Sequence, residues 1–246
     1  MPIVAADLLA RLAATMANDD TSTTGGAIDT AAIAAMDHFT SAAVAALVSD
    51  GADTRVVTIY GRLATGAIAN EDVTLNGAVE VLSVNTYDRL LQVTIASTSG
   101  TRTVTVKQGA GGTTRITFPP NTSKARCFFY NAISAAAPQT RYEKMFWLDN
   151  HGSLALLDAQ VTLTADPQAD ITIALSTSVN DSVTTANRKT EPGSIGAWTD
   201  DAVAINVPGT NLAAGAKIGT WIRQSLAGGN AAYKDSFTTQ LSGGTI

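Results

Sequence analysis

The residues that most often carry catalysis are scarce in this sequence. His38 and His151 are its two histidines, Cys127 is its one cysteine, and no Gly-x-Ser-x-Gly nucleophile motif occurs. Nucleophilic catalysis needs a nucleophile, a base and an orienting group held together. A zinc site needs about four ligands of the Cys, His or carboxylate type. These counts predict a protein that is not an enzyme, with no metal site and no cofactor.

A glycine-rich run and several loop aspartates raise the questions of a phosphate-binding loop and of a calcium site. The run Gly109-Ala110-Gly111-Gly112-Thr113 has strand-like residues on both sides, whereas a phosphate-binding loop needs a helix directly after it. We therefore expect a hairpin turn there. Calcium binding depends on carboxylates at fixed spacings, and the loop aspartates lack such spacing, so turn formation is the favoured role. These aspartates are Asp166, Asp170, Asp181, Asp200 and Asp201.

Tryptophans are the candidates for contacts with other molecules. In the expected strand from Lys217 to Arg223, Trp221 faces opposite to Ile218 and Ile222. One face of that strand is then core, and Trp221 covers a neighbouring loop or subunit. Trp198 lies in a long polar loop, residues 187–201, which its indole can pin to the sheet. Sugar binding by such loop aromatics is the alternative.

Charge argues against nucleic-acid binding. Charged residues make up 15% of the chain and the net charge is -5, while phosphate-backbone binding relies on clustered Lys and Arg. The acidity is concentrated in the first 50 residues, where Arg11 is the one basic residue among six aspartates. No stretch has the length of a membrane span, and residues 1–16 lack the pattern of a signal peptide. We expect neither secretion nor membrane association.

The first 52 residues have the periodicity of helices. Apolar residues from Val4 to Met16 recur at helical spacing, and a polar loop at 18–26 precedes a second periodic stretch from Asp29 to Leu47. Two short amphipathic helices cannot cover each other's apolar stripes. The sequence therefore predicts a helical N-terminal arm over 1–52 that docks on its own body or on another subunit.

The rest of the chain has the period of β-strands. Short apolar alternations separated by turns predict an immunoglobulin-like β-sandwich over 53–120 and a larger, jelly-roll-like sandwich over 121–246, both antiparallel. A hairpin is expected between the alternation at 159–165 and that at 171–175. The expected strands of the larger sandwich are 126–131, 142–148, 154–164, 171–176, 203–207, 217–226 and 236–241. The fold class is mostly β.

Several short motifs resemble a class of tailed-phage virion proteins. They are Arg141-Tyr142-Glu143-Lys144-Met145-Phe146-Trp147-Leu148, the stretch from Ala169 to Leu175, Asn187-Arg188-Lys189-Thr190-Glu191-Pro192, and Gly219-Thr220-Trp221-Ile222-Arg223. The resemblance covers about residues 54–246. It implies a capsid decoration or cement protein with immunoglobulin-like modules and no catalytic residues, located in the virion.

The expected partners follow from this resemblance. They are other copies of the chain, in a trimer or higher homo-oligomer, and major capsid or tail proteins, with no direct contact to nucleic acid or membrane. A tail, neck or baseplate component and a receptor- or carbohydrate-binding module are the alternatives. The candidate subunit contacts are Leu8, Leu9, Leu12, Met16, Ile33, Met36, Trp198 and Trp221.

Overall fold

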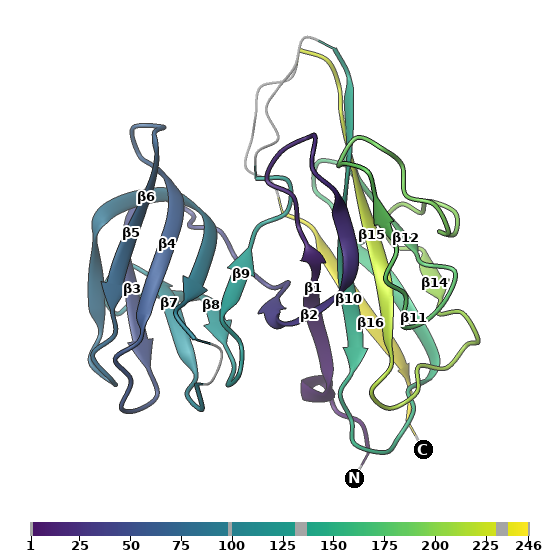
Figure 1. The fold of residues 1–246 in the computed structure, drawn as a ribbon, viewed down its shortest axis with the longest axis horizontal. Coiled ribbons are helices and arrows are strands. Elements are labelled where there is room, and N and C mark those ends of the chain that lie inside the picture. Colours follow the sequence, from purple (N-terminus) through teal and green to yellow (C-terminus); the bar gives the residue numbers. More distant parts are fainter. Residues whose placement is uncertain (1, 98–99, 131–136, 230–235, 246) are drawn as a thin grey trace. The chain divides into compact units, whose positions relative to one another are not determined.

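The computed structural model describes residues 2–97, 100–130, 137–229 and 236–245, and it is mostly β, with 53% strand and 1% helix (Figure 1). Two compact units form the chain. Unit 1 comprises residues 1–29 and 129–246, and unit 2 comprises residues 30–128. These bounds differ from the three segments expected from the sequence, because the first 29 residues pack with the C-terminal part of the chain.

In chain order, the elements are η1 (Ala5–Asp7), β1 (Leu8–Thr15), β2 (Thr24–Ile33), β3 (Ala43–Ser49), β4 (Val56–Leu63), β5 (Ile68–Thr74), β6 (Val81–Ile95), β7 (Val104–Gln108), β8 (Thr113–Phe118), β9 (Lys124–Arg126), β10 (Gln139–Asp149), β11 (Leu157–Ala165), β12 (Ile171–Leu175), β13 (Thr184–Thr185), β14 (Ala204–Asn206), β15 (Lys217–Leu226) and β16 (Thr238–Gly244).

The prediction of a helical N-terminal arm over residues 1–52 is wrong. Residues 8–15, 24–33 and 43–49 are strands, and β1 pairs antiparallel with β10 from Leu8↔Asp149 to Leu12↔Met145. Three consecutive residues of β1, Arg11 to Ala13, are buried, so both faces of the strand are covered. Such a strand reads as a continuous apolar run, which periodicity alone cannot separate from a helix. Pairing with β10 then outweighs the helix preference of Leu and Ala.

Unit 2 is organised around the long strand β6. The first half of β6 pairs with β3, from Val81↔Leu47 to Tyr87↔Ala43, and the second half pairs with β4 and β9. Further hairpins join β4 to β5 and β7 to β8, and β3 also pairs with β7. Residues 85–88, Asn-Thr-Tyr-Asp, have a composition typical of a turn, but they continue β6. The hairpin turn at 109–112 is confirmed between β7 and β8.

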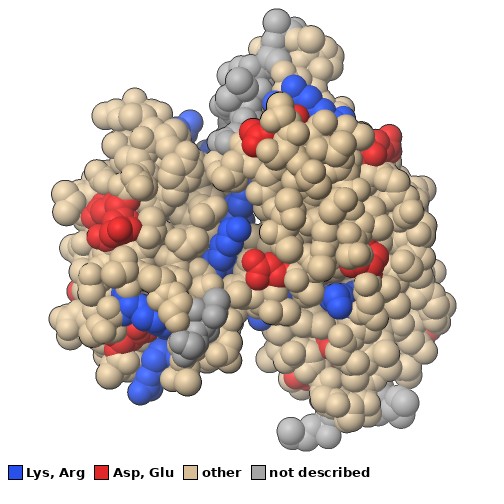
Figure 2. All heavy atoms as spheres, in the orientation of Figure 1, with Lys and Arg blue, Asp and Glu red and all other residues tan. Residues whose placement is uncertain are grey.

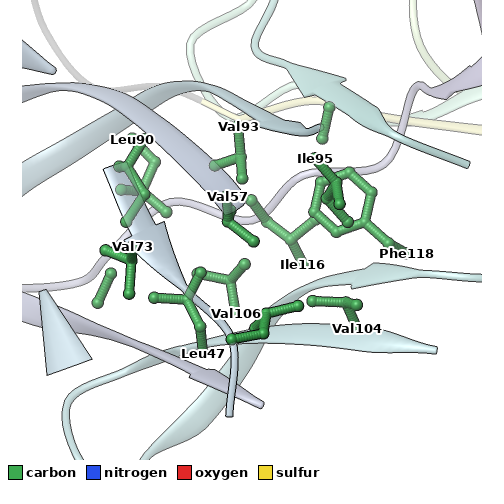
Figure 3. Close-up of a cluster of buried hydrophobic side chains, with 14 of the residues drawn as sticks. Leu47, Val57, Val73, Leu90, Val93, Ile95, Val104, Val106, Ile116 and Phe118 are labelled. Atoms are coloured by element: carbon green, nitrogen blue, oxygen red, sulfur yellow. The ribbon is translucent and has the colours of Figure 1, made fainter. Parts of the chain in front are cut away.

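An apolar cluster fills unit 2. Side chains from strands β3 to β8 point toward one another (Figure 3). Those labelled in the figure are Leu47, Val57, Val73, Leu90, Val93, Ile95, Val104, Val106, Ile116 and Phe118. Alternation along each strand gives these residues one common face, and burial of apolar area supplies most of the stability of such a cluster.

Unit 1 contains two sheets. In the first, β10 pairs with β15 and β1, and β15 pairs with β12, all antiparallel. The second has the order β14-β11-β16. The expected hairpin between 159–165 and 171–175 is wrong: both strands exist, but β11 pairs with β14 and β16 while β12 pairs with β15. The strand expected at 126–131 is wrong: β9 ends at Arg126 and residues 127–130 are not strand, while residue 131 lies outside the described residues.

We expect β1 to be essential for unit 1. Leu12 is fully buried, so Leu12→Ala should lower the free energy of unfolding by about 2–5 kcal/mol through lost burial and a new cavity. Tryptophan fluorescence during urea unfolding measures this unit specifically, because all three tryptophans belong to it. The matched control Leu9→Ala removes a partly exposed leucine of the same strand and should cost clearly less. Equal costs would argue that β1 is not packed as described.

Candidate functional site

One face of the β10–β15 pair carries an unusual set of side chains. The register places Tyr142 opposite Arg223, Lys144 opposite Trp221 and Phe146 opposite Gly219. Because side chains alternate across a strand, Tyr142, Lys144 and Phe146 project to the same side of the sheet. We call these three residues with Trp221 and Arg223 the Lys144 face. It combines two cations with three aromatic rings.

Lys144 is the most deeply buried of these cations. Its side chain is 0% exposed and forms an ion pair with Asp181, which is 2% exposed. The Lys144 Nζ also donates to the backbone oxygens of Gly26 and Val183, at 3.2 Å each. Nζ lies 4.6 Å from the Phe146 ring centroid and 5.4 Å from that of Trp221, within the range of cation–π attraction. The ammonium is thus enclosed by oxygen acceptors and aromatic faces.

Two glycines make room for this arrangement. A Cβ on Gly219 would overlap Asp181 Oδ2 and would lie 2.6 Å from Ser176 Oγ and 2.7 Å from Lys144 Cε. A Cβ on Gly25, where φ is +102°, would lie 2.7 Å both from the Trp221 ring and from the Val183 oxygen. Real Cβ atoms do not approach other atoms so closely, so these positions require glycine. The three groups around Gly219 therefore converge on one point of β15.

The electrostatics of this pocket are unusual. Burial lowers the pKa of Lys144, and the hydrogen bond and charge of Asp181 oppose that shift. Asp181 Oδ1 accepts from Lys144 and, at 3.0 Å, from the Val183 N–H. Among the described residues, Asp181 Oδ2 and Ser176 Oγ are buried without a hydrogen-bond partner. A buried carboxylate oxygen without a partner is costly.

A second network joins the loop between β1 and β2 to β10. Arg141 donates to both oxygens of Asp20, at 3.0 Å each, and Arg188 and Lys189 approach Asp20 at 3.0 and 3.2 Å. Arg188 also pairs with the buried Glu143, at 3.2 Å. These cations hold the pKa of Asp20 far below its usual range, with Arg141 the largest cause. The acidic N-terminal segment is thus bound to the protein's own cations through Asp20.

Trp198 is tied to the Lys144 face. Its indole N–H donates to Glu191 Oε1 at 2.6 Å, its ring lies 5.5 Å from that of Tyr142, and Arg223 stacks 4.8 Å from its centroid. The loop is therefore pinned to the sheet by this tryptophan, as expected from the sequence. The stacked guanidinium also takes up part of the ring surface that a sugar would need.

The other residues predicted to contact a second subunit differ in burial. Trp221 and Leu12 are fully buried in unit 1, and Met16 is also buried. Leu8 and Leu9 are partly exposed in β1. Ile33 belongs to the apolar cluster of unit 2, and Met36 packs against that cluster. Packing on the protein's own core, the alternative weighed for these residues, accounts for the buried ones, and a contact role remains a prediction for the exposed ones.

An apolar surface strip lies instead on unit 2, at the start of β6. Val79, Leu82 and Val84 are 60%, 45% and 91% exposed. Glu71 of β5 accepts from the N–H groups of Val84 and Asn85, at 2.6 and 2.9 Å. This carboxylate fixes the backbone beneath the strip and occupies two donors that another strand could use. We call Val79, Leu82 and Val84 the β6 strip: Leu82 and Val84 alternate on one side of β6, and Val79 lies just before the strand, bridged to Asn76.

The sequence places Lys144 in a motif and Asp181 among the loop aspartates, but it does not predict their pairing. Lys144 follows Glu143 in a strand that also carries Arg141 and Asp149, so its charge does not stand out there. The partner lies 37 residues away, and nothing distinguishes Asp181 from the other loop aspartates.

In the described ranges, no group of three or more His, Cys, Asp or Glu side chains is arranged to hold a metal ion. Among the same residues, no helical segment has the length and apolar character needed to span a membrane. The chain matches no family model, no curated protein and no solved structure.

The Asp20 network predicts a pH-dependent stability. Because the pKa of Asp20 is lowered by folding, its contribution is fully present above the usual aspartate pKa and is lost as the pH falls below about 4. Asp20→Asn should lower the free energy of unfolding at neutral pH by about 1.5–3 kcal/mol. Urea unfolding over a pH series should show this gap closing at the acid end. The exposed control Asp201→Asn should follow the wild type; a gap that does not depend on pH would contradict the assigned ion pairs.

Gly219 offers a test of the Lys144 pocket. Gly219→Ala should lower the melting temperature markedly, since the new methyl group overlaps three polar or buried atoms. The matched control is Gly152→Ala, whose Cβ would meet nothing within 4 Å. Circular dichroism melting of the two variants measures the difference. Similar small effects at both positions would show that the pocket is looser than the structure has it.

Proposed function

We propose that this protein is a structural component of a tailed-phage virion, most specifically a capsid decoration or cement protein without enzymatic activity. In this proposal the two units are β-sandwich modules, unit 2 being immunoglobulin-like. The protein stabilises the particle by binding neighbouring subunits through buried apolar area. The support is the β6 strip on the surface, together with the motifs between Arg141 and Arg223 that resemble virion proteins.

The β6 strip is the observation that carries the proposal. A 91% exposed valine close in the chain to two other exposed aliphatic residues is typical of a surface that becomes covered by a partner. Glu71 holds the strand backbone rigid and blocks strand addition at two of its N–H groups. The contact therefore uses side chains on a preformed surface, which suits a fixed interface between subunits.

The distribution of charge supports the same role. In Figure 2, charged side chains are scattered over each unit between wide areas without charge. Several cations of unit 1 are bound internally: Arg141, Lys144 and Arg188 are each at most 3% exposed. Few of these charges remain to attract a phosphate backbone, and interface cores are depleted of charge.

Two alternative functions would use different residues of the surface or a different place in the particle. A tail, neck or baseplate component would use the same β6 strip, and the particle location separates it from a decoration protein. A carbohydrate-binding module would use Trp198, but this ring already stacks on Arg223 and donates to Glu191. A sugar platform has less support for that reason.

We expect the β6 strip to hold the oligomer together. Light scattering of the purified protein should give a trimer or higher oligomer, and the double variant Leu82→Lys with Val84→Lys should give monomers, because two charges cannot be buried at an apolar interface without partners. Melting temperatures should stay within a few degrees, since both side chains are exposed. The control Val203→Lys changes an exposed valine of unit 1 and should leave the oligomer intact.

The particle itself provides the decisive measurement. Virions purified from the producing bacterial culture should contain the chain at a fixed ratio to the main shell protein, and electron microscopy should locate it on the head. Location on the tail would favour the alternative. A monomeric wild type that is absent from all particle fractions would contradict the proposal.

A further inference from the structure

We propose that Lys144 and Asp181 condense to an intramolecular amide, a covalent cross-link between β10 and the loop that follows β12. The inference rests on the pocket in unit 1 and does not depend on the proposed virion role. It is carried by three features of the pocket: contact between the two reacting groups, exclusion of water, and a backbone donor placed on the carbonyl oxygen of the product.

The reacting groups are held in contact by the fold. Nζ of Lys144 is fixed by the backbone oxygens of Gly26 and Val183, at 3.2 Å each, while it contacts Asp181 Oδ1. The carboxylate of Asp181 is held as well, since the Val183 N–H donates to its Oδ1 at 3.0 Å. The amine of Lys144 comes from β10 and the carboxyl group of Asp181 from the loop after β12, and these hydrogen bonds hold the two groups in contact. Such positioning lowers the entropic barrier of a bond-forming step.

The buried environment favours neutral reactants. The side chains are 0% and 2% exposed, and aromatic rings of Phe146 and Trp221 lie against the amine. Burial lowers the pKa of Lys144, which increases the share of the free amine. Transfer of one proton from the ammonium to the carboxylate within the pair gives an amine and a carboxylic acid. No group outside the pair is needed for this transfer.

The bond changes balance without a co-reactant. The Nζ lone pair attacks Cγ of Asp181, a C–N bond forms, and the electron pair of the C=O bond moves to Oδ1, where the Val183 N–H stabilises the negative charge. The nitrogen then loses a proton to the Oδ2 hydroxyl, which leaves as water while the C=O bond re-forms. Ammonium and carboxylate are thereby converted to a neutral amide and one water molecule.

Formation of the amide removes two unfavourable features of the ion pair, an unpartnered carboxylate oxygen and two buried charges. Asp181 Oδ2, which has no hydrogen-bond partner among the described residues, is the leaving oxygen. Two buried charges also disappear, so their desolvation cost is relieved. The amide keeps one N–H for the backbone oxygen of Gly26 or Val183, and its oxygen keeps the Val183 N–H. The pocket thus satisfies the amide better than it satisfies the ion pair.

Intact mass under denaturing conditions tests the cross-link. The wild type should be lighter than its sequence by the mass of one water molecule, and trypsin should fail to cleave after Lys144. Tandem mass spectrometry should identify a branched peptide that joins the Lys144 and Asp181 segments. A wild-type protein with its full sequence mass and normal cleavage after Lys144 would overturn the proposal.

Single substitutions show which residues account for the mass deficit of one water molecule. Lys144→Met and Asp181→Ala should each have the full sequence mass, whereas the surface control Lys217→Met should keep the deficit of the wild type. A deficit that persists in Lys144→Met would place the dehydration elsewhere and refute the cross-link. These readouts use denatured chains, so they remain valid if a variant folds poorly.

Discussion

The burial of a single lysine constrains much of unit 1. Lys144 is held at the centre of the β10–β15 pairing, directly opposite Trp221, with no exposed surface. A buried ammonium is tolerated only where acceptors surround it. This requirement fixes the path of β2 through the Gly26 oxygen and the path of the loop after β12 through Asp181 and Val183. The glycines at positions 25 and 219 follow from the same requirement, because any side chain there would fill the space of these partners.

The sequence predicts strands well where glycine- or proline-containing turns bound the alternation, even in β15, where five consecutive residues are buried. The strand expected at 217–226 has the bounds of β15, and the alternation at 171–176 differs from β12 by one residue. The prediction fails at β1, because its apolar run satisfies a helical and a strand pattern equally, and β10, which decides between them, lies far away in the chain. Asn85 to Asp88 have turn composition, yet they continue β6 because β3 and β4 both pair there.

Pairing between strands is harder to predict than the strands themselves. A short polar turn between two alternating segments predicts a hairpin, and 166–170 is such a turn. It instead carries the chain from β11 of one sheet to β12 of another, since each strand finds a longer partner elsewhere, β16 and β15. The candidate site shares this difficulty. Lys144 lies in a strand with other charged residues, Arg141, Glu143 and Asp149, and its partner is defined only when the loop after β12 has folded over β15.

Both units contain ion pairs, but those of unit 1 are the more deeply buried: Lys144 and Asp181 are 0% and 2% exposed, against 16% and 4% for Arg55 and Asp53 of unit 2. Unit 1 places ion pairs in its interior, and the binding of Asp20 by Arg141 and Arg188 closes the β1–β2 loop onto β10. Unit 2 has an apolar cluster and leaves aliphatic side chains on its surface at the β6 strip. Internal ion pairs specify a unique arrangement more than they add stability, while exposed aliphatic groups gain free energy only on association. Unit 1 is therefore suited to holding a rigid geometry, while unit 2 presents the aliphatic surface on which the proposed subunit contact depends.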